Sequence, residues 1–164
     1  MLLIRDAREE DLPAIVAIYN DSIPERRASA DSRPISVDSR REWFGQHSPQ
    51  HYALWVCESG IEIVGWLSFS PFYGRPAYAS TAEISLYVAS HHRRRGIGQA
   101  LLAKAMDQAP ALGLGTLLAF VFAHNAPSLS LFRKFRFQQW GYLPKIAKLD
   151  EVERDLVILG RGSS

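Results

Sequence analysis

The stretch AEISLYVASHHRRRGIGQALLAKAM, residues 82–106, joins a strand-like segment to a helix-like segment through a turn rich in arginine and glycine. After the turn, apolar residues fall at positions 97, 101, 102, 105 and 109, which predicts one buried helix face ending near Pro110. The first turn of a helix exposes unpaired backbone N–H groups and the positive end of the helix dipole. Gly96 and Gly98 carry no Cβ, so a ligand can approach this backbone closely. The stretch therefore predicts a site for phosphate oxygens between a strand and a helix.

Two well-known phosphate-binding loops do not fit this turn. The lysine-containing P-loop pattern is absent, and the third glycine of the dinucleotide fingerprint falls on Leu101. Nucleic-acid binding through Arg93, Arg94 and Arg95 is an alternative, which predicts an affinity that falls steeply with salt. The chain has 19 basic and 17 acidic residues, and no aromatic residue is interleaved with the three arginines. We therefore expect a small phosphorylated ligand and no nucleic-acid partner.

The composition predicts a single globular domain over residues 1–164. Hydrophobic residues make up 47% of the chain and charged residues 22%, as in ordinary water-soluble proteins. The start of the chain lacks the apolar core of a signal peptide, and no apolar run approaches the roughly 20 residues that span a bilayer. We therefore expect a cytoplasmic protein without a membrane partner.

Cysteine and histidine usage argues against a disulfide framework and a metal site. The single cysteine, Cys57, is expected to be a small buried apolar side chain. The five histidines show no metal-ligand spacing, and His91 and His92 are expected to be solvated turn residues. No metal is therefore expected.

Hydrophobic periodicity predicts seven strands and four helices. Strands are expected near residues 2–7, 51–58, 61–72, 80–90, 115–123, 137–143 and 154–161, and helices near 11–19, 36–46, 97–109 and 125–137. The residues from Glu83 to Val121 are expected to form a strand–helix–strand crossover between parallel strands, whereas several neighbouring strands form hairpins. The expected fold class is α/β, of the α+β kind, with a mixed central sheet of about seven strands flanked by helices.

The turn and its surroundings also resemble a known family. Arg93-x-x-Gly96-x-Gly98 matches the [QR]-x-x-G-x-[GA] signature of the GNAT superfamily of N-acetyltransferases. The strand AEISLYV and the segment HNAPSLSLFRKFRF resemble the elements on either side of that signature in the family, and the resemblance covers residues 2–160. A further phrase is similar to the phosphinothricin and methionine-sulfoximine acetyltransferase group, and its residues here are Tyr78, Thr81, Glu83, Ser85, Tyr87 and Val88.

The resemblance implies a GNAT fold with an acetyl-CoA cleft where two parallel strands splay apart. The exposed strand edge would pair with the pantetheine amides, the turn would hold the pyrophosphate, and Asn125 would contact the pantetheine arm as well as cap a helix. The implied cofactor-binding residues are Leu86, Tyr87, Val88, Arg93, Arg94, Arg95, Gly96, Ile97, Gly98, Gln99, Asn125 and Ser128. The resemblance also implies a homodimer.

Glu83 is the expected catalytic base. An alkyl amine is mostly protonated at neutral pH, so its attack on a thioester needs a group that takes the proton, directly or through water. Strand alternation predicts Glu83, Ser85 and Tyr87 on one face, and burial beside the cleft would raise the carboxyl pKa. The alternative role for Glu83 is a structural ion pair with an arginine. The family's usual Tyr or His for protonating the thiolate corresponds here to Phe132, so we expect no dedicated general acid.

The acceptor side is expected near the loop FYGRPAY, residues 72–78, before the Glu83 strand. Arg75 is a candidate clamp for an α-carboxylate, with a solvated loop arginine as the alternative. The expected substrate-binding residues are Tyr73, Arg75, Tyr78, Glu83 and Ser85. Residues 25–34 are a further candidate, and Trp43 and Phe44 are expected in the core or in a pocket wall.

The expected activity is acetyl-CoA-dependent transfer of an acetyl group to the primary amine of a small amino-acid-like substrate, of the phosphinothricin, methionine sulfoximine or methionine sulfone type. One alternative keeps the chemistry and changes the acceptor to a protein N-terminus, a polyamine or an aminoglycoside. A second alternative, of a different class, is a non-catalytic acyl-CoA-binding module, against which the presence of Glu83 argues.

Overall fold

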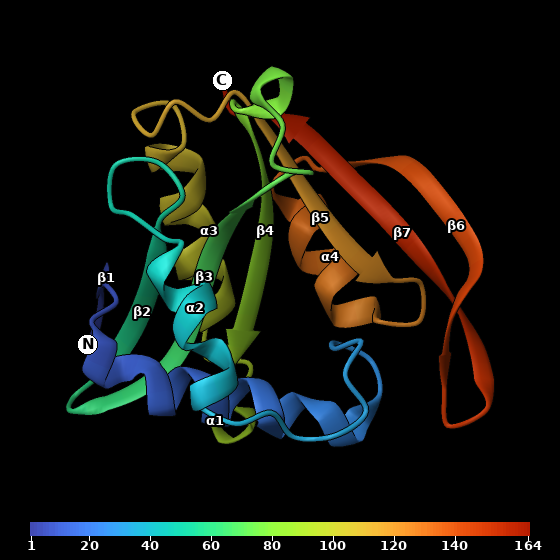
Figure 1. The fold of residues 1–164 in the computed structure, drawn as a ribbon, viewed down its shortest axis with the longest axis horizontal. Helices are drawn as coiled ribbons and strands as arrows, with labels where there is room; N and C mark the ends of the chain where they lie inside the picture. Colours follow the sequence, from blue (N-terminus) through green and yellow to red (C-terminus); the bar gives the residue numbers. More distant parts are fainter.

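The computed structural model describes all residues, 1–164, and contains one mixed seven-stranded sheet with the strand order β1-β2-β3-β4-β5-β7-β6 (Figure 1). The strands are β1 (Leu2–Asp6), β2 (Leu54–Ser59), β3 (Glu62–Pro71), β4 (Thr81–Val88), β5 (Thr116–Phe122), β6 (Gln138–Leu149) and β7 (Val152–Gly162). The helices are α1 (Leu12–Ser22), α2 (Arg41–Gly45), α3 (Ile97–Gln108) and α4 (Ala126–Lys134). The expected element order and the mixed sheet are therefore confirmed.

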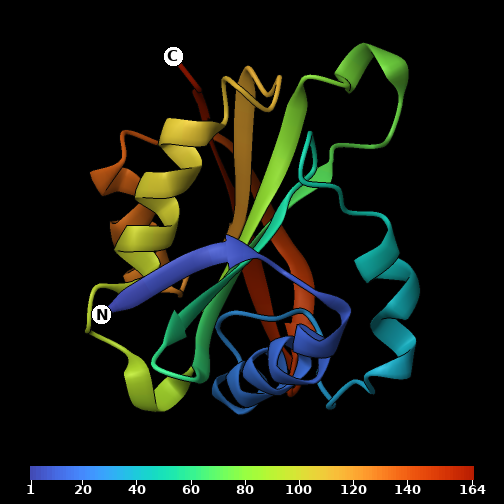
Figure 2. The ribbon, with the colours of Figure 1, turned by 90° about the vertical axis from the view of Figure 1, so that its left-hand side faces the viewer.

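Helices cover both faces of the sheet. Figure 2 shows α3 and α4, in yellow and orange, on one face, with α1 and α2, in blue and cyan, on the other. The larger core cluster joins α3 and α4 to the sheet and includes the fully buried Leu101, Leu117 and Phe69. A smaller cluster joins Ile15 of α1 to Trp66 of β3. Burial of these apolar side chains is the main stabilising contribution of both layers.

The two central parallel strands separate, as the family resemblance implies. β4 pairs in parallel with β5 only from Thr81 to Glu83, opposite residues 116–118, although β4 continues to Val88. Beyond that point β5 stays paired with β7, and β4 stays paired with β3. The edge of β4 that faces β5 is therefore free of sheet partners from Ile84 to Val88, and the two strands diverge toward their arrowheads in Figure 1.

Local sequence signals give most helix boundaries correctly. The Asn125 side chain accepts a hydrogen bond from the backbone N–H of Ser128 at 3.3 Å and caps α4, as expected. The segment predicted as a helix over 36–46 is instead a 3-10 turn, Asp38–Arg40, followed by the single-turn α2. Its short length follows from packing, because only Trp43 and Phe44 offer apolar area to the smaller cluster.

The last hairpin is longer than its sequence pattern predicts. β6 extends to Leu149, past Pro144, and a shift in register between Leu143 and Ala147 absorbs the irregular residues. Cys57 is fully buried in the core, as expected. No helix of the structure combines the length and apolar character needed to cross a lipid bilayer.

Candidate active site

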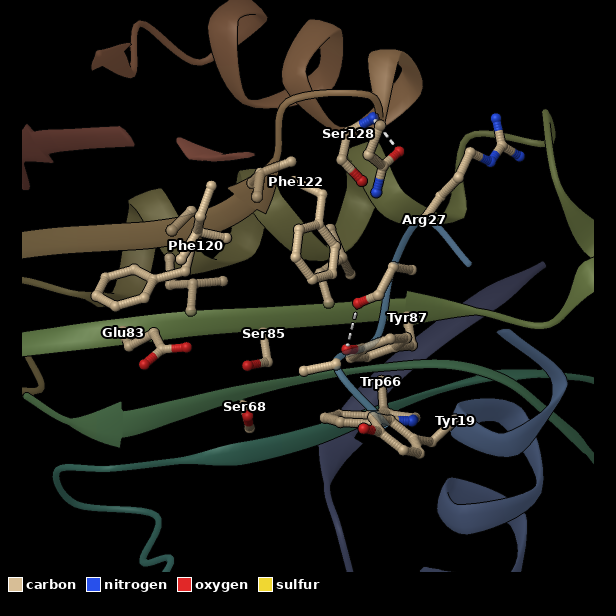
Figure 3. A pocket seen from close by; sticks show the side chains of 18 of the residues that line it. Tyr19, Arg27, Trp66, Ser68, Glu83, Ser85, Tyr87, Phe120, Phe122 and Ser128 are labelled. Carbon is tan, nitrogen blue, oxygen red and sulfur yellow. Dashed lines mark hydrogen bonds between the residues drawn. The ribbon is translucent and has the colours of Figure 1, made fainter. Parts of the chain in front are cut away.

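Two adjoining cavities occupy the region where β4 and β5 separate. The aromatic cavity, of about 480 Å³, lies over β3, β4 and β5 (Figure 3), and the turn cavity, of about 570 Å³, lies beside the glycine turn. The residues that line both are Arg27, Ala28, Leu86, Tyr87, Asn125, Ser128 and Phe132. The two cavities therefore meet along these shared residues, and we call them together the passage, which extends from the turn to the point where β4 leaves β5.

The turn cavity is bordered by the glycine turn that precedes α3. Gly96 adopts φ 78° at the N-cap of α3, and a Cβ built there would meet no atom within 4 Å, so its backbone is open to a ligand. Arg94, two residues before Gly96, also has a positive φ, 63°. The peptide N–H groups that begin α3 lack partners within the helix.

Eleven of the twelve residues expected to bind a cofactor line these cavities. They are Leu86, Tyr87, Val88, Arg93, Arg94, Gly96, Ile97, Gly98, Gln99, Asn125 and Ser128. Arg95 lies outside the lining, and its guanidinium contacts His92 Nδ1 at 3.3 Å. Arg93 lines the turn cavity and forms an ion pair with Glu25, at 2.6 Å.

Glu83 lies in the aromatic cavity at the last residue of β4 that pairs with β5. Its carboxylate is half-buried and forms no ion pair or side-chain hydrogen bond in the protein, so the structural alternative of an arginine partner is absent. Burial alone raises the pKa of the Glu83 carboxyl above its usual value. A raised pKa makes the ionised carboxylate a better proton acceptor, which suits a general base.

The face of β4 that carries Glu83 continues as the cavity floor. Figure 3 shows Glu83, Ser85 and Tyr87 in sequence along β4, beside Ser68 and Trp66 of β3. Ser68 is directly opposite Ser85 in the sheet register, and Trp66 is opposite Tyr87. The predicted alternation of β4 is confirmed, since Ile84 instead joins the larger core cluster.

Aromatic rings form the walls of this cavity. Trp66 stacks on Tyr87 with ring centroids 4.9 Å apart, and Trp43 meets Trp66 edge-to-face at 5.6 Å. Trp43 and Phe44 both pack on the smaller cluster, and Trp43 also lines the cavity, so it has both of the expected roles. The sequence did not predict Trp66 and Tyr19 as cavity residues. The only sequence signal for Trp66 was its position two residues before Ser68 on the same strand face, and the only signal for Tyr19 was its place on the apolar face of a helix.

A strap, residues 25–31, crosses the passage between the two cavities. The Tyr87 hydroxyl donates a hydrogen bond to the Ala28 carbonyl at 2.9 Å, and Arg26 pairs with Asp150 of the β6–β7 turn at 2.7 Å. The imidazole of His124 contacts the Arg26 carbonyl at 2.6 Å. These contacts fix a segment whose geometry the sequence left open, and they place Arg27 and Ala28 in both cavity walls.

Arg40 adds a positively charged side chain to the aromatic cavity that also contains the carboxylate of Glu83. Its guanidinium lies 5.4 Å from the ring centroids of Tyr19 and Trp43, and its one ion-pair contact, to Asp31, is long at 3.9 Å. No side-chain hydrogen bond within the protein uses its N–H donors. Arg27, by contrast, is held by Glu25 at 2.7 Å.

The loop expected on the acceptor side lies beside the cavity rather than in its lining. Tyr73, Arg75 and Tyr78 are exposed and line neither cavity, because their loop lies before β4, whose lining residues begin only at Glu83. The loop reaches the cavity through Phe72, whose ring lies 6.5 Å from that of Phe120, a lining residue. Phe132 lines both cavities and offers no proton donor.

The geometry thus combines a strand edge free of sheet partners, a glycine turn at the start of a helix and a half-buried, unpaired carboxylate along the passage. Comparison with protein families gives a match to the acetyltransferase (GNAT) family over residues 12–137. Similar relatives include the provisionally named phosphinothricin acetyltransferase YwnH of Bacillus subtilis (strain 168), 45% identical over 98% of both chains. The L-methionine sulfoximine/L-methionine sulfone acetyltransferase of Pseudomonas paraeruginosa is 32% identical over 88% of this chain and 85% of that one.

Solved structures agree with the sequence relatives. The GNAT superfamily phosphinothricin acetyltransferase from Sinorhizobium meliloti, determined in complex with acetyl-CoA, superposes with a TM-score of 0.92 at 26% identity, covering 98% of this chain and 88% of that one. The family match, the relatives and the shared fold lead to one conclusion: this chain belongs to the GNAT family of acetyltransferases.

Proposed function

We propose that this chain transfers the acetyl group of acetyl-CoA to the primary amine of a small amino-acid-like acceptor. The observation that carries the proposal is the unpaired, half-buried Glu83 at the point where β4 leaves β5, on a passage that leads from the glycine turn. Relatives named for phosphinothricin and for methionine sulfoximine support the class of acceptor. We also propose that residues 1–164 form a single domain, because one sheet runs through nearly the whole chain.

The residues present fit acetyl-CoA. The turn amides from Arg94 to Gln99, with Arg93, would hold the pyrophosphate, and the free edge of Leu86 to Val88 would pair with the pantetheine amides. Bound acetyl-CoA supplies an activated thioester. The structure of the Sinorhizobium meliloti relative in complex with acetyl-CoA supports this assignment.

In the proposed reaction, Glu83 takes the proton that the ammonium form of the acceptor must lose, directly or through water. The neutral nitrogen forms the new C–N bond as the C–S bond breaks, and a backbone N–H near Val88 polarises the carbonyl. The acylated nitrogen gives up its second proton to the departing thiolate or to water, which completes the amide. The thiolate leaves without a dedicated acid, because a thiol with an ordinary pKa of roughly 8.5 is already a good leaving group. Phe132 at the usual donor position is consistent with this.

A release assay for free thiol tests the activity. Acetyl-CoA is mixed with phosphinothricin, methionine sulfoximine, methionine sulfone, a polyamine and a short peptide in parallel. We expect turnover with the amino-acid-like acceptors and little with the others. Preference for the peptide or the polyamine would establish the alternative acceptors, and acetyl-CoA binding without turnover on any amine would establish a non-catalytic module.

We further propose that Arg40 binds the carboxylate of the acceptor. Its guanidinium faces the aromatic cavity with unused N–H donors and lines the same space as Glu83. Arg40→Gln is expected to raise the KM for methionine sulfone by about 10- to 100-fold, the usual effect of losing a hydrogen bond to a charged group. The KM for the matching amine without a carboxylate should change little.

Arg75→Gln is the matched control for that measurement. The clamp at Arg75 stays a prediction, and its exposed position outside the cavity lining leads us to expect an unchanged KM in this variant. A large effect at Arg75 and none at Arg40 would assign the carboxylate to the loop instead.

The homodimer and the cytoplasmic location also stay predictions. Support for an assembly comes from the β6–β7 hairpin, which has no covering helix in Figure 1 and exposes apolar side chains. Those side chains are Trp140, Tyr142, Leu143, Ile146 and Val152. An exposed apolar surface of this kind is typical of a contact between protein chains.

A further inference from the structure

Three side chains at the edge of the molecule, of which only His92 lines a cavity, converge on one point. The Nε2 atoms of His91 and His92 both approach Oε2 of Glu62, at 2.9 and 3.2 Å. The three donor atoms lie within 4.8 Å of one another. Glu62 begins β3 and the histidines follow β4, so the fold joins residues that are 29 and 30 positions apart.

We propose that Glu62, His91 and His92 bind a zinc ion. Zn²⁺ takes imidazole and carboxylate ligands at about 2.0–2.2 Å in tetrahedral sites, which places neighbouring ligand atoms about 3.3 Å apart. The two N···O distances in the structure are close to that spacing. His91 and Glu62 are exposed, so the ion can reach the site from solvent, and water would complete its coordination. Imidazole ligands favour zinc over the hard cations that prefer oxygen alone.

The site adjoins the turn that the proposed function assigns to the pyrophosphate. His92 lines the turn cavity, and its Nδ1 accepts a hydrogen bond from Arg95 at 3.3 Å, since a guanidinium can only donate. A neutral imidazole that binds zinc through Nε2 carries its proton on Nδ1. Zinc and the Arg95 hydrogen bond therefore compete for His92, and the zinc-bound form releases Arg95 beside the cofactor turn.

Calorimetric titration of the tag-free protein with Zn²⁺ tests the site. We expect one ion per chain, with affinity lowered about tenfold or more in His91→Ala and in Glu62→Gln, because even outer partners of a metal contribute about 10- to 100-fold. Glu153→Gln removes an exposed carboxylate elsewhere and should bind as the parent does. Equal affinity in the parent and both ligand variants would overturn the proposal, and their circular dichroism spectra would show whether they fold.

Arg95→Met gives a second readout with the opposite sign. It removes the competing donor and a nearby positive charge, so zinc should bind about threefold more tightly or better. Unchanged or weaker zinc binding in this variant would exclude His92 Nε2 as a ligand. Because neither titration measures acetyl transfer, failure of the zinc site would leave the proposed enzymatic function unaffected.

Discussion

Glu83→Gln is expected to lower kcat by about 100-fold or more while acetyl-CoA binds with unchanged affinity. A positioned general base typically contributes 10²- to 10⁴-fold, and the amide cannot take the proton from the acceptor. The substitution keeps the shape of the side chain and breaks no ion pair, because Glu83 has none. Steady-state rates with methionine sulfone, together with calorimetric titration of acetyl-CoA, measure the two quantities separately.

The dependence of kcat on pH tests whether Glu83 acts as the base. Burial raises the pKa of the Glu83 carboxyl, so the base is lost to protonation as the pH falls through a value above that of an ordinary glutamate. The parent enzyme should therefore show an acidic limb in kcat that Glu83→Gln lacks. An identical limb in both proteins would remove Glu83 as the base. Glu42→Gln, which changes an exposed carboxylate on α2, should keep both the rate and the limb.

The same pKa shift predicts the stability of the variant. A carboxyl whose folded-state pKa is raised contributes stability below its unfolded pKa and loses that contribution as the pH rises through the folded pKa. At neutral pH the buried Glu83 carboxylate is therefore a cost to folding. Glu83→Gln removes this charge, so the variant should be at least as stable as the parent, and a loss of activity cannot be attributed to unfolding.

Local patterns were enough to predict the parts of the site that one segment builds. The alternation of β4, the turn at Gly96 and the cap at Asn125 depend on neighbours within a few residues, and the structure has each as expected. The parallel arrangement of β4 and β5 follows from the crossover, whereas their separation was implied only by the family resemblance, and the strand pairing confirms both.

Features that depend on contacts between distant segments could not be predicted from the sequence. The strap is fixed by Tyr87, His124 and Asp150, which lie far along the chain, so no periodicity within the strap itself reveals its place. The entry of Arg40 and Trp66 into the aromatic cavity likewise depends on sheet register and on how α1 and α2 pack. The spacing of the histidines in the sequence did not predict the proposed metal site, because Glu62 is distant in the sequence and is brought beside the two histidines only by folding.

Gly96→Asp is expected to abolish measurable acetyl-CoA binding while the fold persists. The glycine has φ 78° at the start of α3, a conformation that costs a residue with a side chain roughly 1 kcal/mol. The larger effect is electrostatic, because the new carboxylate would stand at the amides proposed to hold the pyrophosphate and repel its negative charge. Calorimetric titration with acetyl-CoA measures the loss, and thermal unfolding reports the cost to stability.

Gly60→Asp separates backbone strain from charge. Gly60, in the turn between β2 and β3, has φ 65° and open space around its Cβ position, which matches Gly96 in both respects. It lines neither cavity, so Gly60→Asp should bear a similar cost in unfolding temperature and bind acetyl-CoA as the parent does. If Gly96→Asp retained micromolar affinity, the glycine turn would not be the pyrophosphate site. If both variants lost acetyl-CoA binding equally, backbone strain in the fold would be responsible. The new charge at Gly60 lies outside both cavities and would not repel the pyrophosphate directly.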